Sequence, residues 1–117
     1  MDRFTTAYIE AALWSSTDES DEQGGEPLDA NYGPDDIAEE TLASILDDCK
    51  TFQRDHADDI GGELERAGHD FWLTRNGHGA GFWDGDWDAD VGAKLTEASH
   101  AYGSVDLYVG DDGFIYS

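Results

Sequence analysis

The stretch PDDIAEETLASILDDCKTFQRDHADDI, residues 34–60, is the longest segment of the chain with one uninterrupted hydrophobic period, and the rest of the predicted architecture is built around it. Its buried-type positions recur at steps of three and four residues, as on one face of an α-helix. These positions are Ala38, Leu42, Ile45, Cys49, Phe52, His56 and Ile60. Pro34 is favourable at the start of a helix, and Gly61-Gly62 ends it. The spacing predicts a long helix from Pro34 to Ile60 with one buried face.

The face opposite this stripe is acidic. On a helical wheel, four carboxylates of the stretch fall within about 40° of one another, and a fifth is expected beside them. They are Asp36, Glu40, Asp47 and Asp58, with Glu39 as the fifth. A rise of about 1.5 Å per residue places the first and the last roughly 33 Å apart, close to the roughly 34 Å turn of B-DNA. The stretch therefore predicts a rigid row of negative charge.

The rest of the chain predicts two further helices and two hairpins. The helices are expected at 4–15 and 88–102, and the strands at 69–75, 80–84, 105–109 and 114–116. Residues 16–33 are expected to form a loop. The fold class expected is α+β: a single domain over residues 1–117, with three helices packed on a small antiparallel sheet in the order α-α-β-β-α-β-β.

The composition is strongly acidic. The 117 residues hold 28 Asp and Glu against 6 Lys and Arg, and the formal net charge is −22. Residues 18–65 hold 17 of the acids and only 2 of the bases, so the charge is concentrated in the first half. This balance excludes direct binding to nucleic-acid phosphates or anionic lipid, except through a counter-ion. A basic protein partner, a bound cation or a salty environment remains as the explanation.

Other classes are excluded by what the sequence lacks. Cys49 is the only cysteine, so an intramolecular disulfide and a cysteine-based zinc cluster are ruled out. Residues 1–4 do not begin a basic segment followed by an apolar run, and no apolar stretch approaches the roughly 18 residues of a membrane span. The expected location is the cytoplasm, with no membrane contact and no cofactor.

The segment DGDWDAD, residues 84–90, is the candidate for a bound cation. Four carboxylates have the offsets of a calcium-binding loop, and they are Asp86, Asp88, Asp90 and Glu97. Val91 stands where such a loop needs glycine, and Gly92 comes one position late. The simpler interpretation is a helix N-terminus, where aspartate is favoured by capping and by the helix dipole.

The stretch AGHDFWLTRNGHGAGFWD, residues 67–84, mixes polar and aromatic residues most densely. If it forms a hairpin, its strands bring His69, Asp70 and Asp84 together, and a histidine beside a carboxylate can act as a base or a ligand. No serine or cysteine accompanies them as a nucleophile, and no glycine-rich phosphate-binding motif occurs. We therefore expect a structural hairpin with an aromatic core, in a protein that is not an enzyme.

This stretch, with LTEASHAY (95–102) and VDLYVGDDG (105–113), resembles a family of small acidic proteins common in bacteriophage genomes. The resemblance extends to the opening helix and to the loop containing GGEPL (24–28). The family is largely of unknown function, so the resemblance implies no catalytic residues. It implies a phage or prophage setting in a bacterial cytoplasm, where small acidic proteins often block host defence enzymes that bind DNA.

These observations lead to the hypothesis of an acidic DNA mimic. It would occupy the basic DNA- or RNA-binding groove of a host defence complex of the CRISPR or restriction type. The expected contacts are Asp36, Glu39, Glu40, Asp47 and Asp58, with Asp18, Glu19, Asp21 and Glu22 as auxiliaries. Two alternatives stay open. One is an acidic accessory protein that binds another protein through the 69–84 hairpin, its charge reflecting salt adaptation. The other is a calcium-binding module.

Overall fold

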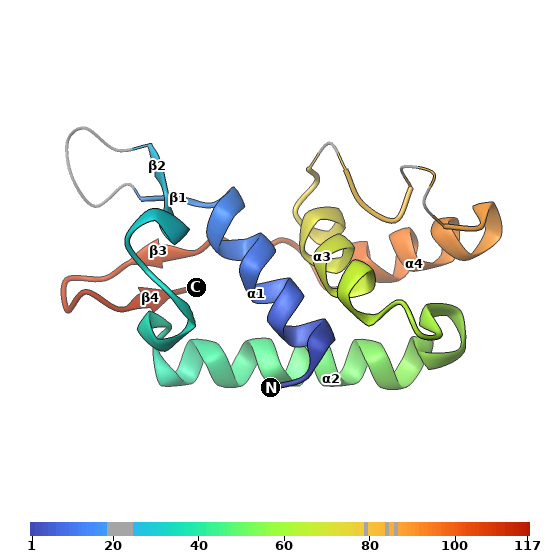
Figure 1. Cartoon of the computed structure of the whole chain (residues 1–117), viewed down its shortest axis with the longest axis horizontal. Coiled ribbons are helices and arrows are strands. Elements are labelled where there is room, and N and C mark those ends of the chain that lie inside the picture. Colours follow the sequence, from blue (N-terminus) through green and yellow to red (C-terminus); the bar gives the residue numbers. More distant parts are fainter. Residues whose placement is uncertain (19–24, 79, 84, 86) are drawn as a thin grey trace.

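The computed structural model describes residues 1–18, 25–78, 80–83, 85 and 87–117, and its longest element is the helix α2 (Glu39–Ile60). This helix runs along the longest dimension of the molecule, which measures 44 × 25 × 21 Å (Figure 1). Its buried residues are Thr41, Ile45, Cys49, Phe52 and Ile60, and Leu42 and His56 are half-buried. The predicted apolar face is confirmed within the helix. Gly61, with a φ of 58°, ends the helix as expected.

The beginning of α2 differs from the prediction. A 3₁₀ turn, η2 (Pro34–Asp36), comes first, and Ile37 and Ala38 then adopt extended backbone with ψ of 128° and 144°. The α-helix starts only after Ala38. The physical reason is a contact with the far end of the chain: Ile37 forms a parallel bridge with Ile115, and the Ala38 N–H donates to the Ile115 carbonyl at 2.8 Å. Near its other end, α2 is kinked at His56 (φ −126°, ψ 22°).

Three more helices and two short antiparallel ladders accompany α2. The helices are α1 (Arg3–Ser15), α3 (Leu64–Arg75) and α4 (Ala89–Ala101). The ladders pair β1 (Thr17–Asp18) with β2 (Glu26–Pro27), and β3 (Tyr108–Val109) with β4 (Ile115–Tyr116). A second 3₁₀ turn, η1, covers Leu28–Ala30.

The α+β class is therefore correct, but its details are not. Helices α1 and α4 and the β3–β4 hairpin confirm three predicted elements, although each strand of the hairpin has only two residues. The described residues contain four α-helices instead of three, and two separate two-stranded sheets instead of one. Among the described residues, the helices pack mainly on one another, and neither two-stranded sheet is the surface on which they pack.

Helix α3 replaces the strand predicted over 69–75, and the described residues 80–83 form no strand. The pair Phe71-Trp72 favours β-structure locally. A helical period appears when the window is extended back to the start of α3, because the inward-facing positions then recur at helical steps. This period is followed by Leu64, Ala67, Gly68, Phe71, Trp72 and Arg75, and three further residues of the helix, Asp70, Leu73 and Thr74, are buried as well. Packing of this face against α1 overrides the local propensity, and the predicted hairpin over 69–84 is wrong.

Helices α1 and α3 lie side by side and run in the same direction (Figure 1). Their closest approach is at Gly68, where a Cβ atom would lie 2.0 Å from the Phe4 carbonyl oxygen. The rings of Tyr8 and Trp72 meet edge to face with 5.4 Å between centroids, and Trp72 Nε1 donates to Ser15 Oγ at 2.7 Å. Glycine at position 68 is what allows the two backbones to come this close.

Aromatic rings fill the core where the helices meet. Phe52 of α2 stacks on Phe71 of α3 with 4.1 Å between centroids, and the rings of Phe4, Phe82 and Tyr102 each lie 5.9 Å from Phe52. Burying one such side chain contributes about 1.5–3 kcal/mol to folding. These rings come from α1, α2, α3, the segment between α3 and α4, and the residue that caps α4. The core therefore holds α2 against the other helices.

The guanidinium of Arg75 is buried in this core, and its side chain is 3% exposed. Its Nη1 donates to Tyr8 Oη at 3.1 Å and to Asp48 Oδ2 at 3.0 Å. Its Nε and Nη2 donate to the carbonyls of Gly103 and Tyr102 at 2.8 and 3.1 Å. These acceptors belong to α1, to α2 and to the end of α4, so one side chain of α3 links all four helices.

Replacing Arg75 by methionine tests this linkage. Arg75→Met keeps apolar volume but leaves four oxygen acceptors without their donor. We expect the free energy of unfolding to fall by about 3 kcal/mol, measured by urea denaturation followed by circular dichroism. The control is Arg66→Met, whose side chain is 46% exposed and whose ion pair with Glu63 lies at the surface. We expect this control to change stability by less than about 1 kcal/mol, and equal losses in the two variants would contradict the linkage.

Adding one methyl group at position 68 tests the contact between α1 and α3. Gly68→Ala forces the two helices apart, and we expect a loss of about 1–3 kcal/mol in unfolding free energy. At Gly62 a Cβ atom meets nothing within 4 Å. Gly62→Ala is therefore the matched control, expected to leave stability unchanged or to raise it by up to about 1 kcal/mol. A fully stable Gly68→Ala protein would show that the two backbones do not touch.

Candidate protein-binding surface

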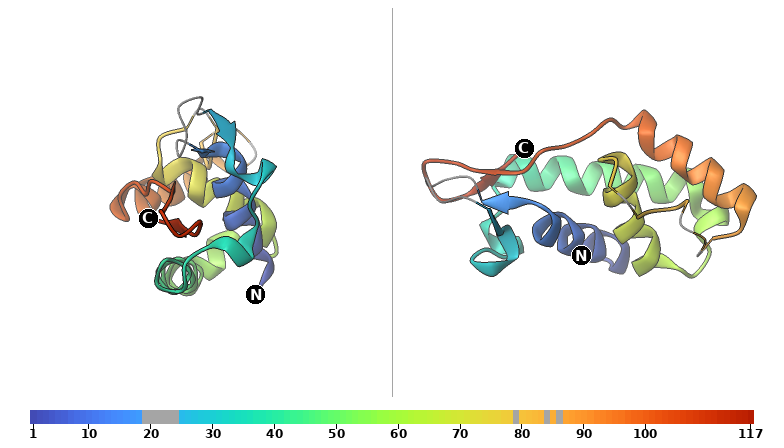
Figure 2. Two further views of the ribbon diagram at one scale, coloured as in Figure 1. Left: turned by 90° about the vertical axis from the view of Figure 1, so that its left-hand side faces the viewer. Right: turned by 90° about the horizontal axis from the view of Figure 1, so that it is seen from above.

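The outward side of α2 carries the exposed carboxylates of Glu40, Asp47 and Asp58. The left view of Figure 2 shows α2 end-on at the lower edge of the molecule, with most of α1, α3 and α4 above it. Glu40 and Asp47 share an angular position to within about 20°, and Asp58 follows after the kink. Glu39 is also exposed, but it is turned about 100° from Glu40 and does not belong to the same row. The row predicted from the sequence is therefore present with three of its five members.

These exposed carboxylates differ from the acids on the flank of α2. Asp48 pairs with Arg75 at 3.0 Å, and Asp59 pairs with Lys94 of α4 at 2.8 Å. The hydrogen bond and the charge of Asp59 raise the pKa of Lys94. By contrast, no base of the described chain lies within ion-pair distance of the three outward carboxylates or of Glu39. One flank of α2 thus uses its acids to hold the fold, and the outward side leaves them to solvent.

Two bases interrupt the row between Asp47 and Asp58. Lys50 is exposed, and Arg54 pairs at 3.2 Å with the residue that follows it. From Glu40 to Asp58 the helical rise gives about 27 Å, shorter than the row expected from the sequence. The surface consequently presents an acidic group at each end and near the middle, rather than an unbroken line of charge.

Asp36 has a different role from the one predicted. It lies in η2, before the extended residues 37–38, and its Oδ2 accepts the Gly33 N–H at 2.8 Å. Of the predicted auxiliaries, Asp18 lies half-buried in β1, and its carbonyl accepts the Gly25 N–H at 3.1 Å. The other auxiliaries, Glu19, Asp21 and Glu22, lie outside the described residues. Asp36 therefore stabilises the turn that precedes α2 and is not part of the outward row.

The described carboxylates at the calcium-loop offsets, Asp88, Asp90 and Glu97, do not converge. Asp88 is the N-cap of α4, and its Oδ1 accepts the Asp90 N–H at 3.1 Å. The rise of α4 places Glu97 about 10 Å beyond Asp90 along the helix. The ligands of one calcium ion lie about 2.3–2.6 Å from it, so these two carboxylates are too far apart to share an ion. Asp86 is outside the described residues, and within them no three Asp, Glu, His or Cys side chains are grouped to hold a metal. Asp88 caps a helix instead.

His69 and Asp70 are in contact, but as neighbours on α3 and not across a hairpin. His69 Nδ1 lies 3.4 Å from Asp70 Oδ1, and the His69 ring stacks on Trp14 with 5.9 Å between centroids. Asp70 is buried, and its Oδ2 accepts the Trp87 Nε1–H at 2.8 Å. Within the described chain, no serine or cysteine lines the hollow beside His69 and Asp70. Asp84, the third residue of the predicted group, is outside the described residues. These contacts tie α1, α3 and the segment before α4 together.

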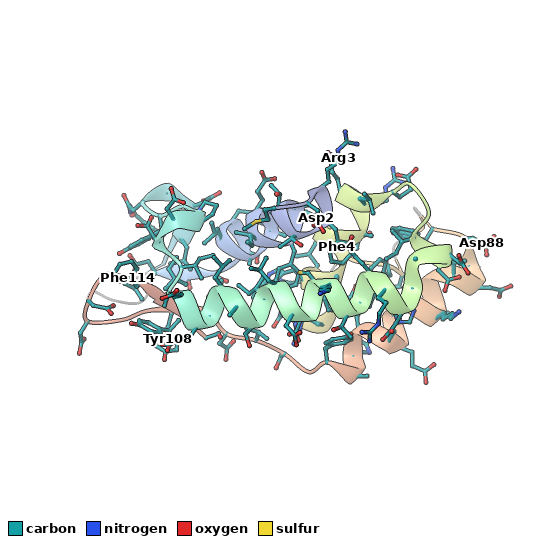
Figure 3. The ribbon with its side chains drawn as sticks, turned by 90° about the horizontal axis from the view of Figure 1, so that it is seen from below. Asp2, Arg3, Phe4, Asp88, Tyr108 and Phe114 are labelled. Carbon is teal, nitrogen blue, oxygen red and sulfur yellow. The ribbon has the colours of Figure 1, made fainter. Side chains whose placement is uncertain are left out.

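One exposed feature was not predicted. Tyr108 and Phe114 are 54% and 45% exposed, and Figure 3 shows both at the end of the molecule where α2 begins. The alternating stretch VDLYV, residues 105–109, contained a signal for this, because a period of two places Tyr108 on the side of Asp106 and away from the buried Leu107. The alternation that predicts the strand is therefore also a signal for the exposure of Tyr108.

The distinction between Asp36 and its neighbours is testable. Asp36→Ala removes the hydrogen bond to the Gly33 N–H, and we expect a loss of about 1 kcal/mol in unfolding free energy by urea denaturation. Asp35 is exposed in the same turn, so Asp35→Ala removes the same charge and is expected to change stability by less than about 0.5 kcal/mol. Equal changes in unfolding free energy for the two variants would show that the hydrogen bond of Asp36 does not stabilise the turn.

No helix within the described residues is both long enough and apolar enough to cross a bilayer. Comparison of the chain with protein-family models, with curated proteins and with solved structures gave no significant match.

Proposed function

We propose that this protein binds another protein and occupies its basic nucleic-acid-binding groove with carboxylates in place of phosphates. The observation that carries the proposal is the row of exposed carboxylates on the outward side of α2, none of which has a base of the described chain within ion-pair distance. A groove that attracts phosphates attracts such carboxylates by the same electrostatics. Each arginine of the groove can hold a carboxylate by paired N–H bonds, as it holds a phosphate.

The packing of α2 supports this role because it fixes the carboxylates before binding. On the inner side of the helix, Phe52 lies in the aromatic stack and Asp48 is paired with Arg75. A disordered acidic tail would lose about 1–2 kcal/mol of backbone entropy for each residue ordered on binding. A helix already held by the core has no such loss.

A narrower proposal concerns the setting. The resemblance of residues 67–84 to bacteriophage proteins supports a phage-encoded inhibitor of a host defence complex, of the CRISPR or restriction type, acting in the bacterial cytoplasm. This step rests on the resemblance and on analogy with known DNA mimics. The proposed role is binding without catalysis and without a cofactor, and it involves no direct contact with nucleic acid or membrane.

Reversing the three outward charges tests the proposal. Tagged wild-type protein should capture a DNA-binding protein from a lysate of a phage-sensitive host, and duplex DNA should displace that protein. Capture should weaken steeply as salt is raised from about 0.05 to 0.5 M, because salt screens exposed charges. We expect the combined variant Glu40→Lys, Asp47→Lys and Asp58→Lys to lose capture while its circular-dichroism spectrum stays unchanged.

The matched control moves the same change in charge to other helices. Glu10, Glu65 and Glu97 are exposed on α1, α3 and α4, and their replacement by lysine should leave capture intact. If both triple variants lose capture equally, binding follows net charge alone, as in an acidic accessory protein adapted to salt. If the α2 variant still captures the partner, the outward side of α2 is not the binding surface and the proposal fails.

A further inference from the structure

A groove of about 760 Å³ lies between the first turn of α2 and the β3–β4 hairpin. Most of its lining is apolar, and the larger apolar side chains are Ile37, Leu42, Phe114 and Tyr116. Its acidic lining consists of Glu39, Glu40 and Asp112. No lysine or arginine of the described chain lines it. The groove therefore combines an apolar floor with a rim of one sign of charge.

Exposed aromatic side chains stand at this groove. Phe114 lines it, and Tyr108 stacks on the lining residue Tyr116 with 6.0 Å between ring centroids. Leu46, one turn of α2 further on, is also exposed. Figure 3 shows Phe114 and Tyr108 beside the beginning of α2. Large exposed apolar side chains that are rimmed by charge are typical of protein-binding sites, where buried aromatic anchors dominate affinity.

The hairpin side of the groove is fixed before any partner arrives. Ile115 is fully buried, and its carbonyl accepts the Ala38 N–H at 2.8 Å. In the turn, Asp112 accepts hydrogen bonds from the Tyr116 hydroxyl and from the Phe114 N–H. These bonds lower the pKa of Asp112, and the bond to Asp112 raises the pKa of Tyr116 to about 12. At neutral pH the Asp112 carboxylate is therefore charged. Because these hydrogen bonds already hold the hairpin in place, its backbone needs little further ordering when a partner binds.

The chemistry of the lining defines what fits it. The stem of a lysine or arginine packs on an aromatic ring while its charged head reaches a carboxylate, and a cation over a tyrosine or phenylalanine ring is attracted to it. An apolar side chain of a bound partner can pack against Ile37 and Leu42 in the same groove. A second copy of this chain would bring a charge of −22 to the same place and be repelled.

We propose that this groove receives a basic segment of the partner protein, in which an apolar side chain is flanked by lysine or arginine. The proposal rests on the proposed function and locates the contact within it that selects the partner. The outward carboxylates of α2 attract any basic surface, whereas the groove accepts only a surface that also offers an apolar side chain between its charges.

Two synthetic peptides of equal length and equal positive charge serve as probes. The first carries leucine and tryptophan between its lysines and arginines, and the second carries serine at those positions. Fluorescence polarisation of the labelled peptides with the full chain, at about 0.1 M salt, gives the two dissociation constants. We expect the apolar peptide to bind at least about tenfold more tightly, because only this peptide buries a side chain in the groove.

Removing the two exposed aromatic side chains at the groove tests the source of this preference. Tyr108→Ser combined with Phe114→Ser leaves every charge in place, and we expect the tenfold preference to disappear while weak, salt-sensitive binding of both peptides remains. Trp14 and Trp83 are similarly exposed elsewhere, at 47% and 55%. The matched control, Trp14→Ser with Trp83→Ser, should keep the preference. Circular dichroism confirms that both double variants are folded.

Equal affinity of the wild type for the two peptides, or equal loss of preference in the two double variants, overturns the groove proposal. So does a wild-type dimer, seen by light scattering, that the groove variant dissociates. The variant Asp47→Lys with Asp58→Lys leaves the groove lining unchanged and separates the two proposals. If it weakens both peptides, the acidic row binds with or without the groove. If it weakens neither and the preference persists, the groove holds and the proposed function fails.

Discussion

The arrangement of the helices depends on one buried charge, the guanidinium of Arg75. Taking an ion out of water costs several kcal/mol, so such a group is stable only where its donors find acceptors. Arg75 finds them on α1, on α2 and at the end of α4, all within 3.1 Å. This requirement is directional, and it fixes three helix positions at once. The aromatic stack around Phe52 supplies burial, but apolar contact alone does not specify orientation in this way.

The helices that the sequence predicts correctly are those whose period repeats over many residues. The stripe of α2 and the amphipathic faces of α1 and α4 are of this kind. Helix α3 was missed because a window starting at His69 sees its β-favouring aromatic residues and omits Leu64 and Ala67. The acidic side of α2 follows from the same period. The helical period does not predict that Asp36 lies outside the acidic side of α2. Asp36 is separated from the helix because Ile115, at the other end of the chain, pairs with Ile37 and holds it in an extended conformation.

The surface around α2 separates two physical tasks. In the proposed role, the exposed carboxylates act at long range and orient a basic partner before contact. The proposed groove acts only at contact, where Phe114 lines it, Tyr108 stacks on the lining residue Tyr116, and burial of apolar area adds to the charge. The groove depends on the anchoring of the hairpin against the segment before α2, since the Ile115 carbonyl accepts the Ala38 N–H. The outward carboxylates depend instead on the packing of α2, through Phe52 and through the Asp48–Arg75 pair.

The division of α2 into a packed side and an open side affects how this sequence can change by mutation. Ile45, Cys49 and Phe52 are enclosed by neighbours, so a substitution there creates a cavity or a clash. Glu40, Asp47 and Asp58 face water, and surface substitutions away from caps and ion pairs rarely change stability by more than about 0.5 kcal/mol. The outward residues can thus change in single steps while folding stays intact. For the proposed binding surface, this means that it can follow a changing partner without passing through unstable intermediates.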